Sequence, residues 1–131
     1  MSATPLRPDF AVDRCLGKTV PARLRAAGWN LTLITDIFAN DAQETSDEKW
    51  MTWAQARLDG AITKDANIRR SPWFSRATMP VFCLANQQLG IDEMTQLFLA
   101  HAERIARIAL AHPGRQFWTI YSDTRMDDRT P

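Results

Sequence analysis

Two kinds of hydrophobic pattern alternate along the chain. Short apolar runs, several of them rich in β-branched or aromatic residues, predict β-strands at residues 10–12, 31–35, 61–63, 80–84 and 117–121. Longer stretches, in which apolar residues recur every three or four positions, predict helices at residues 16–27, 46–58 and 92–111. Strands that alternate with helices predict an α/β fold, a mostly parallel central sheet with helices on both faces.

The predicted helices carry recognisable end signals. Gly28 follows the first helix, and Thr45 and Glu48 have the spacing of a capping box at the start of the second. The third and longest helix stops at the breaker His112-Pro113-Gly114. Its predicted buried stripe consists of Met94, Leu97, Phe98, His101, Ile105, Ile108 and Ala109.

Length and composition indicate one globular domain. The chain has 131 residues, of which 45% are hydrophobic and 24% charged, as in ordinary soluble proteins. We expect a single domain at residues 9–121, a flexible proline-containing lead-in at 1–8 and a flexible polar tail at 122–131. No apolar run resembles a signal peptide or approaches the roughly 20 residues of a membrane span, which favours a cytoplasmic protein.

Charge and cysteine content exclude some kinds of site. The net charge is only +1, so any affinity for a phosphate backbone has to come from a local cluster of basic residues. Cys15 and Cys83 match no metal-binding spacing, and both are expected to be reduced, buried thiols.

Aspartates stand where several predicted strands end. Asp13, Asp36 and Asp65 each follow a strand, and Asp47 lies in the first turn of the helix that leads into the third strand. In a parallel sheet these positions meet at one edge, which is where open α/β sheets bind ligands. Carboxylates that gather there repel one another unless a cation joins them. Oxygen ligands without histidine or cysteine favour Mg²⁺ or Mn²⁺ over zinc.

Each acid also has an ordinary explanation. Aspartate is common in turns after strands, and Asp47 would favour the dipole of its helix without any metal. His101 lies on the apolar stripe of the third helix and is expected to be packed rather than catalytic.

Two segments resemble PIN domains. SDEKWMTWAQARLDGAITKD, residues 46–65, is similar to the PIN signature in which an acid opens a helix and a strand then delivers Thr-x-Asp. FAVDRCLGKTVPARLRAAGWN, residues 10–30, resembles the first strand and helix of PIN-like proteins from bacterial toxin–antitoxin loci. The resemblance implies a three-layer PIN-like fold and a Mg²⁺- or Mn²⁺-dependent endoribonuclease of the VapC toxin type, opposed by a cognate antitoxin. It also implies that Asp13, Asp47 and Asp65 are the catalytic, metal-binding residues.

The sequence departs from the family at one point. PIN domains commonly carry a further glutamate on a helix between the first acid and the helix-start acid. Here that region is a predicted loop whose only acids are Asp36, Asp41 and Glu44. A catalytically degenerate PIN-like binding module in a protein complex is therefore an alternative. A receiver-like or phosphatase domain is a weaker one, because the first strand delivers a single acid and no lysine follows Lys64.

Two basic regions are candidates for partner binding. Arg69, Arg70 and Arg76 surround Trp73 and Phe74 directly after Asp65, which suits single-stranded RNA, although the aromatic residues could equally fill the core. The outer side of the third predicted helix carries charged residues that would be solvated, or would contact an antitoxin or a second copy of the chain in a homodimer: Glu103, Arg104 and Arg107.

Overall fold

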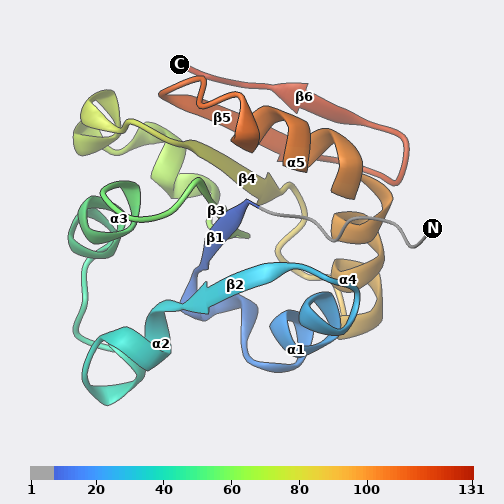
Figure 1. The fold of residues 1–131 in the computed structure, drawn as a ribbon, viewed down its shortest axis with the longest axis horizontal. Helices are drawn as coiled ribbons and strands as arrows, with labels where there is room; N and C mark the ends of the chain where they lie inside the picture. The colour runs from blue at the N-terminus through green and yellow to red at the C-terminus, as the bar shows by residue number, and fades with distance from the viewer. Residues whose placement is uncertain (1–7) are drawn as a thin grey trace.

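A six-stranded sheet forms the centre of the computed structural model, which describes residues 8–131 (Figure 1). The strand order is β2-β1-β3-β4-β5-β6. All neighbours are parallel except β6, which runs antiparallel to β5. The strands are β1 (Asp9–Val12), β2 (Asn30–Leu33), β3 (Gly60–Thr63), β4 (Pro80–Leu84), β5 (Gln116–Ile120) and β6 (Met126–Asp128).

Helices cover both faces of the sheet and make three layers. One face carries α1 (Thr19–Ala26), α4 (Ile91–Ala100) and α5 (Ala102–Leu110), and the other carries α2 (Ile34–Ile37) and α3 (Asp47–Gln55). The part of the chain that the structure describes also contains four 3-10 segments: η1 (Arg14–Leu16), η2 (Asn40–Ala42), η3 (Ala66–Arg70) and η4 (Pro72–Arg76). The predicted α/β architecture, a mostly parallel sheet flanked by helices, is confirmed.

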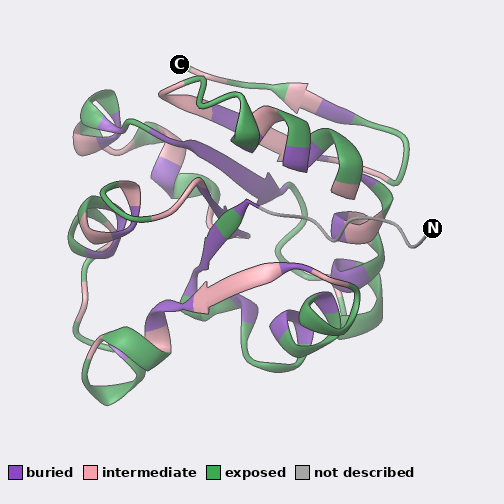
Figure 2. Ribbon diagram, viewed as in Figure 1, coloured by how far each residue is buried: buried purple, intermediate pink, exposed green. Residues whose placement is uncertain are grey.

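The sheet separates two hydrophobic cores because successive side chains of a strand point to opposite faces. In β1, Phe10 and Val12 enter the core beneath α1, α4 and α5, whereas Ala11 enters the core beneath α3. Figure 2 shows the resulting burial, with the central strands buried and the helices buried on their inner sides only. Gly60 allows close packing here, since a Cβ at this position would lie 3.1 Å from the Pro80 carbonyl oxygen and 3.2 Å from the Phe10 ring.

The second predicted strand is shorter than expected. It ends at Leu33, and the chain then turns into the single-turn helix α2, although Ile34 and Thr35 favour strands. β2 is an edge strand, paired only with β1. Turning the backbone there lets Ile34, which is 2% exposed, enter the core beneath α3. Asp36 consequently lies in α2 rather than at a strand end, and it is exposed.

The single long helix predicted for residues 92–111 is wrong. His101 leaves the helical conformation, with φ −107° and ψ 12°, and separates α4 from α5. Its Nε2 lies 2.7 Å from the main-chain oxygen of Ser122, and its side chain is buried. A tertiary contact therefore sets the break, while the apolar stripe continues through it.

The segment 122–131, predicted to be a flexible tail, instead contains a paired strand. Met126 pairs with Ile120 of β5 and is 2% exposed in the core beneath α5. Arg104 of α5 donates a hydrogen bond of 2.8 Å to the main-chain oxygen of Met126. Backbone pairing with β5 and one buried methionine suffice to order a segment that is otherwise polar.

Two further predictions concern the N-terminus and membrane insertion. Of the predicted lead-in 1–8, residues 1–7 lie outside the described residues, and Pro8 is buried. None of the helices within residues 8–131 has the length and apolar character needed to cross a membrane.

Candidate metal centre

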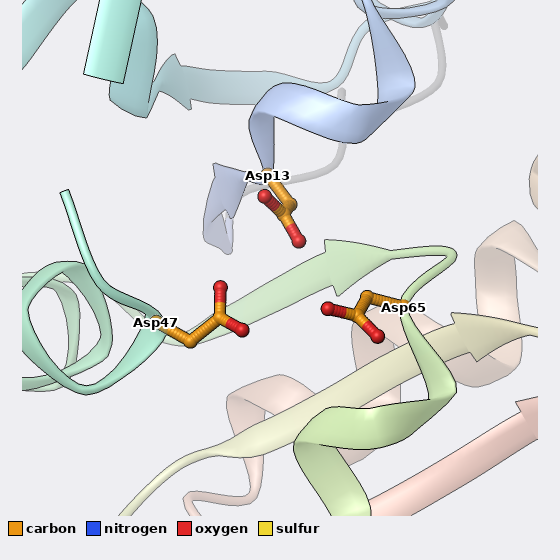
Figure 3. Close-up of side chains that lie close together, drawn as sticks. All are labelled: Asp13, Asp47 and Asp65. Carbon is orange, nitrogen blue, oxygen red and sulfur yellow. The ribbon is translucent and has the colours of Figure 1, made fainter. Parts of the chain in front are cut away.

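Three aspartate side chains meet at the carboxyl ends of β1 and β3 (Figure 3). Asp13 directly follows β1, Asp65 follows β3 by two residues, and Asp47 is the first residue of α3. β1 and β3 are neighbours, while the crossovers through α1 and α3 leave on opposite faces of the sheet. Such a reversal point is where open α/β sheets form their binding crevice. One carboxylate oxygen from each residue lies within 4.8 Å of the others.

The Thr63 hydroxyl links two of these acids. It donates a hydrogen bond of 2.7 Å to Asp13 Oδ2 and accepts one of 3.0 Å from the main-chain N–H of Asp65. The Asp13 N–H in turn donates to the Ile62 carbonyl at 3.1 Å, which continues the pairing of β1 with β3. Because Thr63 ends the buried strand β3, the sheet itself fixes the relative position of Asp13 and Asp65.

Asp65 and Asp47 each also accept a hydrogen bond from a residue two or three positions later in the sequence. Asp65 caps η3, and its Oδ1 accepts a hydrogen bond of 2.9 Å from the Asn67 N–H. Asp47 Oδ1 accepts a hydrogen bond of 2.9 Å from Nε1 of the buried Trp50. This role of Trp50 was not predicted from the sequence, although its position three residues after Asp47 is the spacing of side chains that meet on a helix.

The start of α3 differs from the capping box predicted for Thr45 and Glu48. Ser46 is the N-cap, and its side chain accepts the N–H of Lys49 at 3.2 Å. Asp47 therefore lies in the first helical turn, where the helix dipole also favours a negative charge.

Burial and mutual repulsion make the site electrostatically unfavourable without a cation. Burial raises the pKa of Asp13, with a smaller contribution from the charge of Asp65, against hydrogen bonds from Thr63 and Cys15. Burial also raises the pKa of Asp47, and the charges of Asp13 and Asp65 add to that effect. Within residues 8–131, none of the three acids forms an ion pair that would offset the burial and the repulsion.

The chemistry of the donors fits a hard divalent cation. The group consists of carboxylates alone. Cys15 is exposed as a residue, contrary to the prediction of a buried thiol, and its Sγ lies 3.5 Å from Thr63 Oγ1. Desolvation of that thiol, together with the charge of Asp13, raises its pKa to about 11, and Cys15 does not belong to the close group of acids. Cys83 is buried as predicted.

A cavity of about 250 Å³ opens onto the carboxylates and gives access to them. Arg14 and Cys15 line it beside the three acids, and Ile34, Ala42, Thr45 and Trp50 complete its wall.

Comparison with known proteins places this geometry in a family. Residues 8–86, more than half of the chain and including all three acids, match the PIN-like domain family. The chain belongs to the PIN-like domain family. It is also 32% identical over 116 residues to VapC45 of Mycobacterium tuberculosis, a protein provisionally named as a ribonuclease, with 84% of this chain and 83% of that protein covered. No solved structure matches significantly. The family resemblance seen in the sequence is thus confirmed, and nothing here favours the receiver-like alternative.

None of the three acids that were candidates for a fourth member of the PIN-like centre lies in it. Asp36, Asp41 and Glu44 are all exposed, and among residues 8–131 the close group contains only the other three acids. Asp41 instead lies 3.6 Å from Lys18 in an exposed ion pair. In this PIN-like domain the chain between β2 and α3 forms only α2 and η2, and it lines the cavity at the centre through Ile34, Ala42 and Thr45 rather than through an acid.

The basic aromatic loop after Asp65 divides into two parts. Phe74 is buried and packs edge-on against Phe117, with 5.8 Å between ring centroids, so it belongs to the core. Arg76 pairs with Glu48 of α3 at 2.6 Å, away from the other arginines of the loop. Arg69 and Arg70 line an open recess beside the PIN-like centre.

Proposed function

We propose that this PIN-like domain is a Mg²⁺- or Mn²⁺-dependent endoribonuclease that acts as the toxin of a type II toxin–antitoxin pair in the cytoplasm. The observation that carries the proposal is the three-carboxylate group of Asp13, Asp47 and Asp65 at the reversal point of the sheet. The name of the mycobacterial relative supports RNA as the substrate. The resemblance of residues 10–30 to PIN-like proteins from toxin–antitoxin loci supports a cognate antitoxin as the partner.

Asp13 and Asp65 would hold the cation, and Asp47 would hold it or orient the attacking water. When bound, the cation supplies positive charge that stabilises the phosphodiester in its transition state and promotes ionisation of water. Thr63 occupies one oxygen of Asp13, which fixes the direction of the other. Trp50 does the same for Asp47, so both carboxylates are oriented before any ligand arrives.

The test is cleavage of single-stranded RNA by purified protein with Mg²⁺ or Mn²⁺. We expect Asp13→Asn and Asp65→Asn to lower the rate by roughly 100-fold or more, since metal-ion catalysis contributes several kcal/mol. EDTA should abolish cleavage. Asp123→Asn is the matched control, because Asp123 is exposed on the turn before β6. Cleavage at the wild-type rate by Asp13→Asn and Asp65→Asn would show that these acids are not the catalytic group.

A catalytically degenerate binding module is the second candidate function. The observation that favours it is the exposure of Asp36, Asp41 and Glu44, which leaves the centre with three acids. Calorimetric titration with Mn²⁺ separates the two functions. A nuclease should bind Mn²⁺ in the wild type and lose that binding in Asp65→Asn, whereas a degenerate module should show no binding that depends on Asp65.

A further inference from the structure

Two adjoining recesses lie beside η3, the segment that directly follows Asp65. The first, of about 270 Å³, begins at Ala66 and Asn67, directly after Asp65. The second, of about 480 Å³, continues past η4 to Arg115 and Pro131. Arg69 and Arg70 line both recesses, so the two form one continuous groove between η3, η4 and the segment that follows β6.

Four arginines line this groove: Arg69, Arg70, Arg115 and Arg129. Within residues 8–131 none of them forms an ion pair with an acid, whereas Arg23, Arg76 and Arg125 each do. The groove therefore concentrates positive charge that no acidic side chain among residues 8–131 pairs with, on a chain whose net charge is only +1. We name these four residues and the recesses they line the arginine groove.

Hydrogen bonds hold three of the four arginines in place, whereas the Arg70 side chain makes none within residues 8–131. Arg69 Nε donates to the Arg129 carbonyl, and the Arg129 guanidinium donates to the Tyr121 hydroxyl at 3.1 Å. Arg115 donates to the main-chain oxygen of Pro131 at 3.1 Å, and its guanidinium lies 5.8 Å from the centroid of the Phe74 ring. A guanidinium has five N–H donors, and these bonds use one or two of them. The remaining donors can bind an anion without rearrangement.

We propose that the arginine groove binds the sugar–phosphate backbone of single-stranded RNA and leads it to the metal centre. This inference rests on the proposed ribonuclease function. Arginine is suited to phosphate because its planar fork binds two phosphate oxygens at once. The carboxylates of the centre repel a polyanion until a cation is bound, so a neighbouring region of positive charge has to supply the affinity.

The groove lies close to the centre. Asn67 lines the first recess and donates its N–H to Asp65 Oδ1 at 2.9 Å, so one hydrogen bond links the edge of the recess to an acid of the centre. Recesses of about 270 and 480 Å³ are of a size for individual nucleotides, which favours a single strand as the ligand. Half of the arginines come from residues after Gly114, beyond the segment that matches the PIN-like family.

The first experiment measures RNA binding without cleavage. A fluorescent single-stranded RNA of about 12 nucleotides, within the size range of known single-strand sites, is titrated with Asp65→Asn protein in EDTA over a range of salt concentrations. In that background we expect Arg70→Gln and Arg115→Gln each to weaken binding roughly three- to tenfold, as for the loss of one hydrogen-bonded charge. Each should also lower the slope of log affinity against log salt by about 0.7, the loss of one phosphate contact.

The matched control is Arg107→Gln, which removes the same charge from the exposed side of α5 on the other face of the sheet. It should leave both affinity and salt slope unchanged, and Arg70→Lys should restore most of the affinity. Equal urea midpoints for all variants exclude a folding defect. Arg70 is the most informative position, because within residues 8–131 no hydrogen bond or ion pair of its side chain supports the fold.

The outcomes separate the groove from the nuclease function. The groove assignment is overturned if Arg70→Gln and Arg115→Gln bind RNA like Arg107→Gln, if the protein binds no RNA, or if duplex RNA competes better than single strands. Cleavage by the wild type is measured separately with Mn²⁺. RNA binding that depends on the groove but occurs without cleavage would reject the nuclease and keep the groove. Cleavage that is unaffected by the arginine variants would reject the groove and keep the nuclease.

Discussion

Removal of one charge from the candidate metal centre should stabilise the protein in the absence of metal. Asp13 is the best position for this test, because it is 6% exposed and its pKa is raised by burial and by the charge of Asp65. Asp13→Asn keeps an oxygen that accepts the Thr63 hydroxyl and changes the side-chain volume very little. The substitution therefore removes charge while it preserves packing and the Thr63 hydrogen bond, although the amide NH2 group cannot accept the hydrogen bonds that Cys15 donates to the carboxylate.

The expected gain follows from the separation of the carboxylates. At the upper limit of 4.8 Å, two unit charges repel by about 0.9 kcal/mol in water and about 3.5 kcal/mol at the effective dielectric constant of 20 that suits protein sites. Asp13 repels both Asp47 and Asp65, but solvent screens the half-buried partners. We expect the free energy of unfolding at pH 7 in EDTA to rise by roughly 1–3 kcal/mol in Asp13→Asn.

The dependence on pH has a definite sign. The pKa of Asp13 is raised in the folded protein. Between the ordinary aspartate pKa and this raised pKa, the folded wild type therefore binds more protons than the unfolded chain. Wild-type stability is thus greatest with the carboxyl group protonated and falls as pH rises through the folded pKa. The difference between Asp13→Asn and wild type should be near zero below the ordinary aspartate pKa of 3.8 and should reach its full value above the folded pKa.

Urea denaturation of the two proteins tests this reasoning, with Asp123→Asn as the control for loss of an exposed charge. In EDTA the order of stability should be Asp13→Asn above wild type. With Mn²⁺ at 100 times its dissociation constant, the wild type should gain about 2.7 kcal/mol and Asp13→Asn far less, which reverses the order or removes the difference. If Asp13→Asn is less stable than wild type in EDTA, repulsion between the carboxylates does not control the stability of the centre and the electrostatic account is wrong.

Three further predictions follow from individual contacts. Trp50→Phe removes the hydrogen bond to Asp47. The Mn²⁺ affinity measured by calorimetry should then fall roughly 10–100-fold, the usual effect of losing a group that orients a metal ligand. Unchanged affinity would mean that the bond does not orient Asp47. Met126→Ala should lower the free energy of unfolding in urea by about 2–5 kcal/mol, as for other buried methionines. An effect near zero would support the original prediction that residues 122–131 form a flexible tail. Mn²⁺ affinity should be unchanged, within error, in the amide variants of the three exposed acids, and a loss in any one would add that residue to the centre: Asp36, Asp41 and Glu44.

The centre of the fold and the grouping of the acids were predictable from the sequence because both depend on local signals. The strand at residues 80–84 has the predicted limits, since it is a continuous apolar run between polar turns. Asp13 follows β1 directly and Asp65 follows β3 by two residues, and parallel topology brings such positions together without further information. The roles of the three acids as ligands and catalysts stay predictions.

The parts that the sequence did not predict depend on contacts between distant segments. His101 interrupts an unbroken apolar stripe because it contacts Ser122, which no helical pattern encodes. Strand β6 has only Met126 as an apolar anchor, and its other support is the free edge of β5. Arg115 and Arg129 are far apart in sequence from Arg69 and line one groove with it only through the tertiary fold.

The bond from Thr63 to Asp13 has a consequence for the order of events during synthesis. Asp13 emerges from the ribosome 50 residues before the hydroxyl that orients it, and its companion carboxylate Asp65 comes two residues after that hydroxyl. A nascent chain that ends before β3 has Asp13 and Asp47 but neither the third acid nor the strand that holds the first in place. The three acids can come together only after β3 has paired with β1. Nascent chains that end before β3 should therefore show no cation affinity. The chain length at which affinity first appears would report when β1 and β3 pair on the ribosome.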